Sequence, residues 1–194
     1  FKNQYVYLDI SGLLQNLAEP FIPLSEQHRM GYEISISSGI TGWMDKDKLE
    51  KIIFNLLSNA FKHAGTDEKI IFSAKENGQN DSLEISVSNS GCTLSPEQLN
   101  KLFVKFYVAG GSPLGTENMG TGIGLAFARQ LSSLMNGSIE AGNEGGWICF
   151  KVQLPLTPRG LDPSVTEKND LISGNPSYLF KSITSYHESF ATTS

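Results

Sequence analysis

The segment from about Asp45 to Ala64 carries the strongest helical pattern in the chain, and it limits the fold more than any other feature. Apolar residues recur at the i, i+3, i+4 and i+7 spacing of one helix face over its whole length. These residues are Leu49, Ile52, Ile53, Leu56, Leu57, Ala60, Phe61 and Ala64. The pattern predicts an amphipathic helix whose apolar face packs against the core.

The polar edge of this helix is a candidate docking place for a ligand. Asn55, Asn59 and Lys62 fall at i, i+4 and i+7, so they share one stripe between core and water. Lys51 and Ser58 are predicted to point the opposite way, to solvent. Taken alone, the stripe is most simply interpreted as an ordinary polar flank. Two Asn residues in mid-helix carry a small propensity cost, however, which packing does not explain.

Strand and helix patterns follow one another along the remaining chain. Strands are expected near residues 5–10, 32–37, 43–44, 69–75, 82–89, 138–141 and 147–154. Helices are expected from a cap at Ser11 to about residue 24, interrupted at Pro20 and Pro23, and over 45–64, 95–106 and 123–135. After Pro155 the pattern collapses into polar, proline-bearing sequence. We therefore expect a domain over 1–156 and a linker or C-terminal tail over 157–194.

Composition excludes several classes of function. With 15 Lys and Arg against 20 Asp and Glu, the formal charge is −5. Neither a nucleic-acid interface nor a polybasic membrane contact is expected at that balance. Cys92 and Cys149 cannot build a disulfide framework, which favours a reducing compartment. There is no apolar run of about 18 residues that could span a membrane. The start at Phe1 lacks an initiator Met and a signal-peptide pattern, which indicates a fragment of a longer protein.

A glycine-rich segment precedes the last expected helix. Gly120-Thr121-Gly122-Ile123-Gly124-Leu125 would leave backbone N–H groups free to face an anion, and the helix dipole adds about half a positive charge there. A flexible hinge is the alternative interpretation. The spacing is GxGxG after a loop, which does not match the dinucleotide-binding fingerprint GxGxxG after a strand. The P-loop pattern GxxxxGK(S/T) does not occur either. The HRD and DFG motifs of protein kinases are absent too.

Four motifs in order resemble the ATP-binding domain of sensor histidine kinases, a branch of the gyrase, Hsp90, histidine kinase and MutL ATPase superfamily. They are an N box at 55–62, a G1 box at 88–91, an F box at 102–107 and a G2 box at 120–125. The resemblance covers roughly residues 4–156. It implies the Bergerat fold, a two-layer α/β sandwich with a mixed, mainly antiparallel sheet of about five strands packed on three helices.

The resemblance also implies roles for the residues of the long helix. Asn59 is expected to ligate Mg²⁺ through its side-chain oxygen, and Asn55 to support the phosphate and metal cluster. Lys62 is expected to meet the phosphates as a point charge. His63 matches a position beside the adenine or ribose, although a solvated residue near the helix end is an equal alternative. Asn55 and Lys62 are thus the candidate catalytic residues, and Asn59 is the candidate metal ligand.

Further nucleotide contacts are implied in the two glycine-containing motifs. They are Asn89, Gly91, Thr93, Leu94, Gly120, Thr121, Gly122, Ile123, Gly124 and Leu125. Residues 107–119 are expected to form a lid over the nucleotide. Phe103 and Phe106 are expected either to anchor the base of that lid or to belong to the core.

Three positions depart from the family pattern. Asn89 stands where the family usually has an Asp that accepts a hydrogen bond from the adenine amino group. An amide accepts without charge assistance, which we expect to cost roughly 1 kcal/mol of ATP affinity. Thr93 replaces the second G1 glycine. Val108 stands where relatives often have a basic residue.

The identity of residue 55 bears on the reaction. ATP-hydrolysing members of the superfamily carry a Glu on this helix as a general base, and Asn55 cannot deprotonate water. The resemblance therefore implies phosphoryl transfer to a positioned acceptor. In sensor kinases the acceptor is a His on a separate dimerisation domain. His28, His63 and His187 lie in no such motif, so that domain is expected upstream, outside this chain.

The function expected from these motifs is the ATP-binding catalytic domain of a two-component sensor histidine kinase. ATP and Mg²⁺ are the expected cofactors, and a response-regulator receiver domain is an expected partner. The expected location is cytoplasmic, within the cytoplasmic part of a membrane-bound sensor. Two alternatives share the fold: a nucleotide-sensing or non-catalytic interaction module, which the three departures favour, and an anti-sigma-factor-like Ser/Thr kinase.

Overall fold

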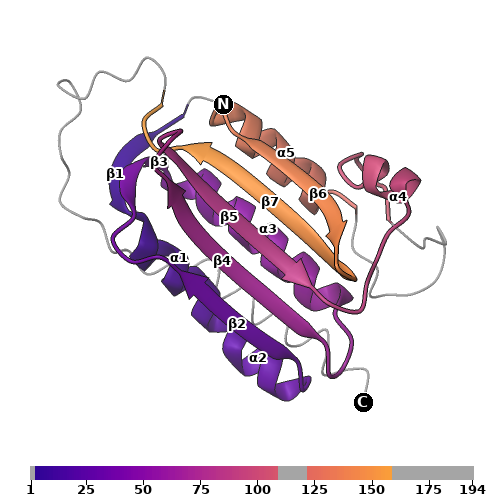
Figure 1. The fold of residues 1–194 in the computed structure, drawn as a ribbon. Coiled ribbons are helices and arrows are strands. Elements are labelled where there is room, and N and C mark those ends of the chain that lie inside the picture. Colours follow the sequence, from indigo (N-terminus) through magenta and orange to yellow (C-terminus); the bar gives the residue numbers. More distant parts are fainter. Residues whose placement is uncertain (1–2, 109–121, 159–194) are drawn as a thin grey trace.

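A mixed five-stranded sheet forms one layer of the domain. The computed structural model describes residues 3–108 and 122–158. The strands, in spatial order, are β2 (Gly31–Ile36), β4 (Lys69–Asn77), β5 (Ser82–Asn89), β7 (Trp147–Pro155) and β6 (Ser138–Glu144). β2 and β4 pair in parallel, and the other three pairs are antiparallel. The expected mixed, mainly antiparallel sheet is confirmed, with β5 at its centre (Figure 1).

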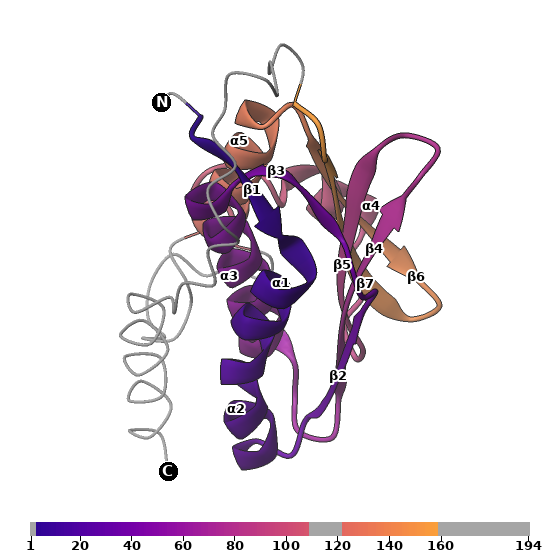
Figure 2. The same ribbon diagram turned by 90° about the vertical axis from the view of Figure 1, so that its left-hand side faces the viewer.

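Helices cover one face of this sheet, which Figure 2 shows edge-on. They are α1 (Ile10–Ala18), α2 (Ile22–Gln27), α3 (Lys46–His63) and α5 (Gly124–Leu134). A short 3₁₀ turn over Glu19–Phe21 separates α1 from α2, so the predicted interruption at Pro20 and Pro23 is confirmed. The predicted cap is wrong: Asp9, not Ser11, caps α1, because its carboxylate accepts a hydrogen bond from the Gly12 amide.

A second, two-stranded sheet anchors the beginning of α3. β1 (Tyr5–Asp9) pairs antiparallel with β3 (Thr41–Asp45). Asp45 then caps α3, and its carboxylate accepts from the backbone amides of Lys48 at 3.0 Å and Gln4 at 2.8 Å. The Trp43 amide donates to the Leu156 carbonyl at 2.8 Å, which connects this small sheet to the end of β7. The start of the central helix is thus fixed from several sides.

The helix after the G1 motif is shorter than predicted. α4 spans Pro96–Lys101 and begins with a capping box between Ser95 and Gln98. It ends five residues before the expected position near Phe106. The chain there makes tight turns, and Phe106 adopts a positive φ of 67°. Its amide donates to the Gly122 carbonyl at 3.0 Å, so the segment turns away from the helix axis to reach the start of α5.

The core lies between the helix layer and the sheet. Leu83, Ile85 and Val87 alternate along β5 and are buried, as are the predicted apolar residues of α3. Ring contacts join the layers, since Phe61 packs within 5.1 Å of Phe21 and 5.0 Å of Tyr32 between ring centroids. Across the described residues, no helix is both long and apolar enough to cross a membrane. The predicted boundary at 156 stays a prediction, because residues 159–194 lie outside the described part.

Candidate functional site

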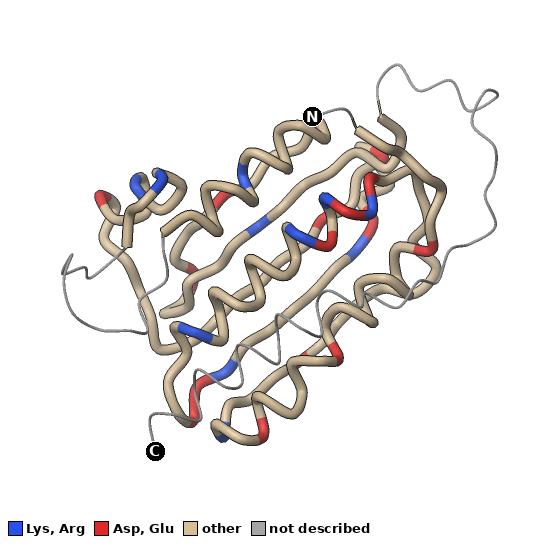
Figure 3. Tube along the Cα trace, turned by 180° about the vertical axis from the view of Figure 1, so that it is seen from behind, with Lys and Arg blue, Asp and Glu red and all other residues tan. Residues whose placement is uncertain are grey.

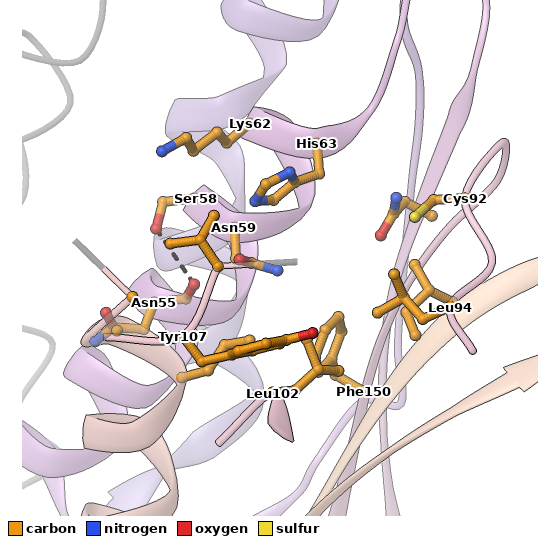
Figure 4. Close-up of a pocket in the computed structure, with 16 residues that line it drawn as sticks. Asn55, Ser58, Asn59, Lys62, His63, Cys92, Leu94, Leu102, Tyr107 and Phe150 are labelled. Atoms are coloured by element: carbon orange, nitrogen blue, oxygen red, sulfur yellow. Dashed lines mark hydrogen bonds between the residues drawn. The ribbon is translucent and has the colours of Figure 1, made fainter. Parts of the chain in front are cut away.

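A cavity of about 320 Å³ opens between α3, the end of β5 and the start of α5 (Figure 4). Its walls come from segments that are far apart in the sequence. The residues lining it are Asn55, Ser58, Asn59, Lys62, His63, Asn89, Cys92, Leu94, Leu102, Tyr107, Val108, Gly122, Gly124, Leu125, Ile148 and Phe150. The cavity therefore brings together parts of all four motifs singled out in the sequence.

The polar edge of α3 forms one wall. Asn55, Asn59 and Lys62 line the cavity, as the helical spacing predicted, and His63, which only the resemblance implied, lines it as well. Ser58 lines it too, so its predicted solvent orientation is wrong. Ser58 lies at i+3 from Asn55 and i−4 from Lys62, which puts it on the same helix face. The Asn55 Nδ2 donates to the Lys51 carbonyl at 2.7 Å, which turns the amide oxygen of Asn55 away from its own helix backbone.

Two glycines allow close packing at the start of α5, Gly124 against α3 and Gly122 against the segment at residues 106–107. A Cβ on Gly124 would lie 2.6 Å from the Asn55 Oδ1, so a side chain there would displace that amide. Gly122 has a φ of +65°, and a Cβ on it would lie 2.7 Å from the Tyr107 carbonyl oxygen. No side chain caps the start of α5. Its first N–H groups are therefore left for a ligand at the edge of the cavity.

Asn89 is a buried polar residue on the cavity wall that the end of β5 forms. It ends β5 and continues the inward alternation of Leu83, Ile85 and Val87, so its side chain lies on the face covered by helices. The residue is 1% exposed, and its Nδ2 has no hydrogen-bond partner among the described residues. An unsatisfied buried donor costs about 1–3 kcal/mol. A ligand with an acceptor atom at this point would remove that cost.

The loop after β5 is shaped by two side chains that the sequence analysis did not identify. The Glu68 carboxylate occupies the place where a Cβ on Gly91 would lie, and it accepts from the Gly65 amide at 2.6 Å. The Asn143 side chain accepts from the Leu94 amide at 3.1 Å and donates to its carbonyl at 2.7 Å. No local pattern marks either residue as a neighbour of this loop, because Glu68 and Asn143 both reach it from distant segments.

Some predicted contacts do not line the cavity. Gly91, Thr93 and Ile123 are absent from its walls, and Thr93 is exposed. Leu94 and Leu125 do line it. Gly120, Thr121 and residues 109–119 of the predicted lid lie outside the described residues. Nucleotide-binding roles for all of these positions stay predictions.

The F-box aromatics have different environments. Phe106 is 74% exposed and so is not part of the core. Phe103 packs against the core, with the Arg129 guanidinium 5.4 Å from its ring centroid. Tyr107 and Val108 line the cavity beside the start of α5. Of the two predicted anchors, only Phe103 is packed in the described structure.

Positive charge outweighs negative charge in this cavity. Burial lowers the pKa of Lys62. Desolvation at the cavity wall and the neighbouring Lys62 charge lower the pKa of His63, which is otherwise an exposed residue. Among the described residues that line the cavity, none is Asp or Glu. Figure 3 shows most charged residues of α3 near its N-terminal end, away from the stripe that includes Lys62. The cavity is therefore suited to an anion.

The residues present fit a magnesium ion bound together with phosphates. Within the described part of the chain, no cluster of three or more His, Cys, Asp or Glu could hold a metal on its own. Mg²⁺ usually keeps several waters and takes further oxygens from substrate phosphates, so it needs few protein ligands. The amide oxygens of Asn55 and Asn59 are neutral, hard donors on the wall that faces Gly124.

The family model described as "Histidine kinase-, DNA gyrase B-, and HSP90-like ATPase" matches residues 44–158. The chain therefore belongs to this ATPase family. Sensor protein VanSC from Enterococcus gallinarum is 29% identical over 147 residues, covering 76% of this chain and 40% of that protein. Sensor histidine kinase TmoS from Ectopseudomonas mendocina is 30% identical over 159 residues, covering 80% and 16%. The chain thus spans two fifths or less of these relatives.

Solved histidine kinase structures share the fold. The catalytic domain of histidine kinase ThkA has a TM-score of 0.69 at 21% identity, over 80% of this chain and 99% of that one. Full-length ShkA in complex with AMPPNP has a TM-score of 0.70 at 24% identity, over 83% and 33%. ThkA in complex with response regulator protein TrrA has a TM-score of 0.68 at 18% identity, over 81% and 43%. The fold is therefore that of a histidine kinase catalytic domain.

Proposed function

We propose that this chain is the ATP-binding catalytic domain of a sensor histidine kinase, which positions ATP and Mg²⁺ for transfer of the γ-phosphoryl group to a His on another domain. The observation that carries the proposal is the cavity that joins the α3 amides to Gly124 at the start of α5 and to Gly122 just before it. Family membership and the fold support the same function. ShkA, whose fold is similar to this one, has been solved in complex with AMPPNP.

The two sides of the cavity suit the two ends of a nucleotide. Figure 4 shows Asn55, Ser58 and Lys62 on one side, and Cys92 and Leu94 on the other. Lys62 and the uncapped start of α5 would bind the triphosphate, because both present positive charge to an anion. Leu94, Ile148 and Phe150 would pack against the base, which is largely apolar on its faces.

The side chains favour transfer over hydrolysis. A general base within reach of a water is what ATP hydrolysis needs, and no carboxylate lines the described walls. Asn55 and Asn59 would hold Mg²⁺ together with the phosphates. The ion, once bound, would neutralise charge that develops on the transferred group. Lys62 and the α5 amides would orient the chain of phosphates toward an acceptor outside this domain.

The proposed partners follow from this reaction. The acceptor His would lie on a dimerisation domain of the same parent protein, and a response-regulator receiver domain would then take the phosphoryl group. ThkA, whose fold is similar, has been solved with a response regulator. A module that binds partners without transferring phosphate is a second candidate, because Asn89 replaces the charged adenine contact of the family.

Calorimetric titration with a non-hydrolysable ATP analogue and Mg²⁺ tests the proposal. We expect saturable binding that is lost in Asn59→Ala. Asn100→Ala is the matched control, because Asn100 is an exposed helical Asn on α4 outside the cavity. No binding by the unaltered chain at millimolar ligand would favour the non-catalytic module. Incorporation of labelled γ-phosphate on His by this chain alone would contradict the need for a separate acceptor domain.

A further inference from the structure

The side-chain amide of Asn89 offers both a hydrogen-bond donor and an acceptor to a ligand bound in the cavity beside the end of β5. We infer that this amide makes the site tolerant of a 6-oxopurine base, so that inosine triphosphate binds about as well as ATP. The inference rests on the proposed function, because it requires a purine nucleotide in the cavity. It adds to that function the breadth of the substrate class.

The surroundings of Asn89 leave its amide to a ligand. In the sheet it pairs with Ile70 of β4 and Ile148 of β7, whose side chains offer no hydrogen bond. Its Nδ2 is buried without a partner among the described residues, and the residue lines the cavity. A buried donor of this kind needs an acceptor on the ligand to recover its lost hydration.

Adenine and the 6-oxopurines present opposite hydrogen-bonding patterns at carbon 6 and N1. Adenine carries an amino donor at carbon 6 and an acceptor at N1. A 6-oxopurine carries an acceptor oxygen at carbon 6 and a donor N–H at N1. An amide can satisfy either pattern with two hydrogen bonds, because a half-turn about its last torsion exchanges its oxygen and its NH₂ group.

A carboxylate at the same point could not pair fully with either base. It accepts only, so it can take one hydrogen bond, from the amino group of adenine or from the N1–H of a 6-oxopurine, while its other oxygen faces the remaining acceptor of the base. The neighbouring side chains Leu94, Ile148 and Phe150 are apolar and cannot supply the missing donor. An amide at residue 89 can therefore pair fully with either class of purine, whichever group stands at carbon 6.

The test compares ATP with ITP, which differ only at carbon 6 and N1, by calorimetry with Mg²⁺. For the unaltered chain we expect dissociation constants within about threefold of each other. In Asn89→Ala we expect both nucleotides to bind about tenfold more weakly, because the amide that pairs with either base is removed. Asn100→Ala is the control, since Asn100 is an exposed Asn outside the cavity and its change should leave both affinities unaltered.

The outcomes separate this inference from the proposed function. If the unaltered chain binds ATP more than tenfold tighter than ITP, the inference is overturned while the proposed function stands. The measurement on the unaltered chain needs no variant to fold. A folded Asn89→Ala that weakens only one of the two nucleotides would also overturn it. If neither nucleotide binds, both the proposed function and the inference fail.

Discussion

The two ends of α3 use polar side chains in opposite ways. Near its start the charges are paired within the protein: Asp45 with Lys48 at 2.5 Å and Asp47 with Lys51 at 2.6 Å. Toward its end the polar side chains, among them Asn59, face the cavity instead. Both ends rest on the same continuous apolar face, which is buried along the whole helix.

This difference separates folding from binding along one helix. A polar group with a partner inside the protein adds to stability, whereas one that faces a cavity is held ready for a ligand at little benefit to the fold. Changes at the start of α3 should therefore alter stability, and changes at its end should alter affinity.

The largest effect is expected for Asp45→Ala. The change removes the α3 cap and the acceptor for the Gln4 amide, and it leaves the buried Lys48 ammonium without its partner. We expect a loss of about 3–5 kcal/mol in the free energy of unfolding, measured in urea. The control Asp47→Ala breaks an exposed pair and should cost less than about 1 kcal/mol. Equal losses in the two variants would contradict the comparison.

Gly124→Ala tests the contact between the two binding elements. Its new methyl group would lie 2.6 Å from the Asn55 Oδ1 and push that amide out of place. We expect affinity for an ATP analogue to fall about tenfold, which corresponds to about 1.4 kcal/mol. Gly142→Ala on β6 is the control, because a Cβ there meets nothing within 4 Å. Affinity within twofold of the unaltered chain would argue against close approach of α5 to α3.

A smaller effect is expected in the stability of Asn59→Ala. Alanine is the better helix former, and no buried apolar contact is lost. We expect the free energy of unfolding without nucleotide to stay equal or to rise by about 0.5 kcal/mol, while binding is lost. A drop of more than about 1 kcal/mol, seen by urea denaturation, would show that Asn59 serves the fold instead.

The pH dependence of stability sharpens the same contrast. Burial alone would raise the pKa of Asp45. Hydrogen bonds from Lys48 and from the Gln4 amide outweigh burial, and they hold the pKa below its ordinary value of 3.8. Because this pKa is lower in the folded chain than in the unfolded chain, the Asp45 carboxylate stabilises the fold fully at pH values above its unfolded-state pKa. The stabilisation is lost as the pH falls through the lower, folded-state pKa. The stability difference between the unaltered chain and Asp45→Asn should therefore be constant from pH 7 to about 5 and shrink below about pH 4. A difference that grows in acid would contradict this assignment.

Much of the α3 stripe could be predicted from the sequence, because helical periodicity is local. Asn55, Asn59 and Lys62 needed only their spacing, and Ser58 could have been included by the same rule. The fold class came from the four motifs in order rather than from strand patterns. Those patterns placed the strands, but they could not show that β1 and β3 form a sheet of their own.

The rest of the site depends on contacts between distant segments. Asn143 contacts Leu94 from 49 residues away, and no local spacing signals that pair. Glu68 takes the space beside Gly91 in the same way, so the reason for that glycine lies in a neighbouring loop. The early end of α4 at Lys101 has a similar cause, since the following turn is fixed by its hydrogen bond to Gly122.

A crystal structure of this chain with Mg²⁺ and a non-hydrolysable ATP analogue would test the central claim most directly. We predict the triphosphate between the α3 stripe and the start of α5, with the metal about 2.1 Å from the Asn59 side-chain oxygen. The base is predicted to lie against Asn89. A nucleotide bound at another surface, with the cavity closed by the protein's own side chains, would contradict the account.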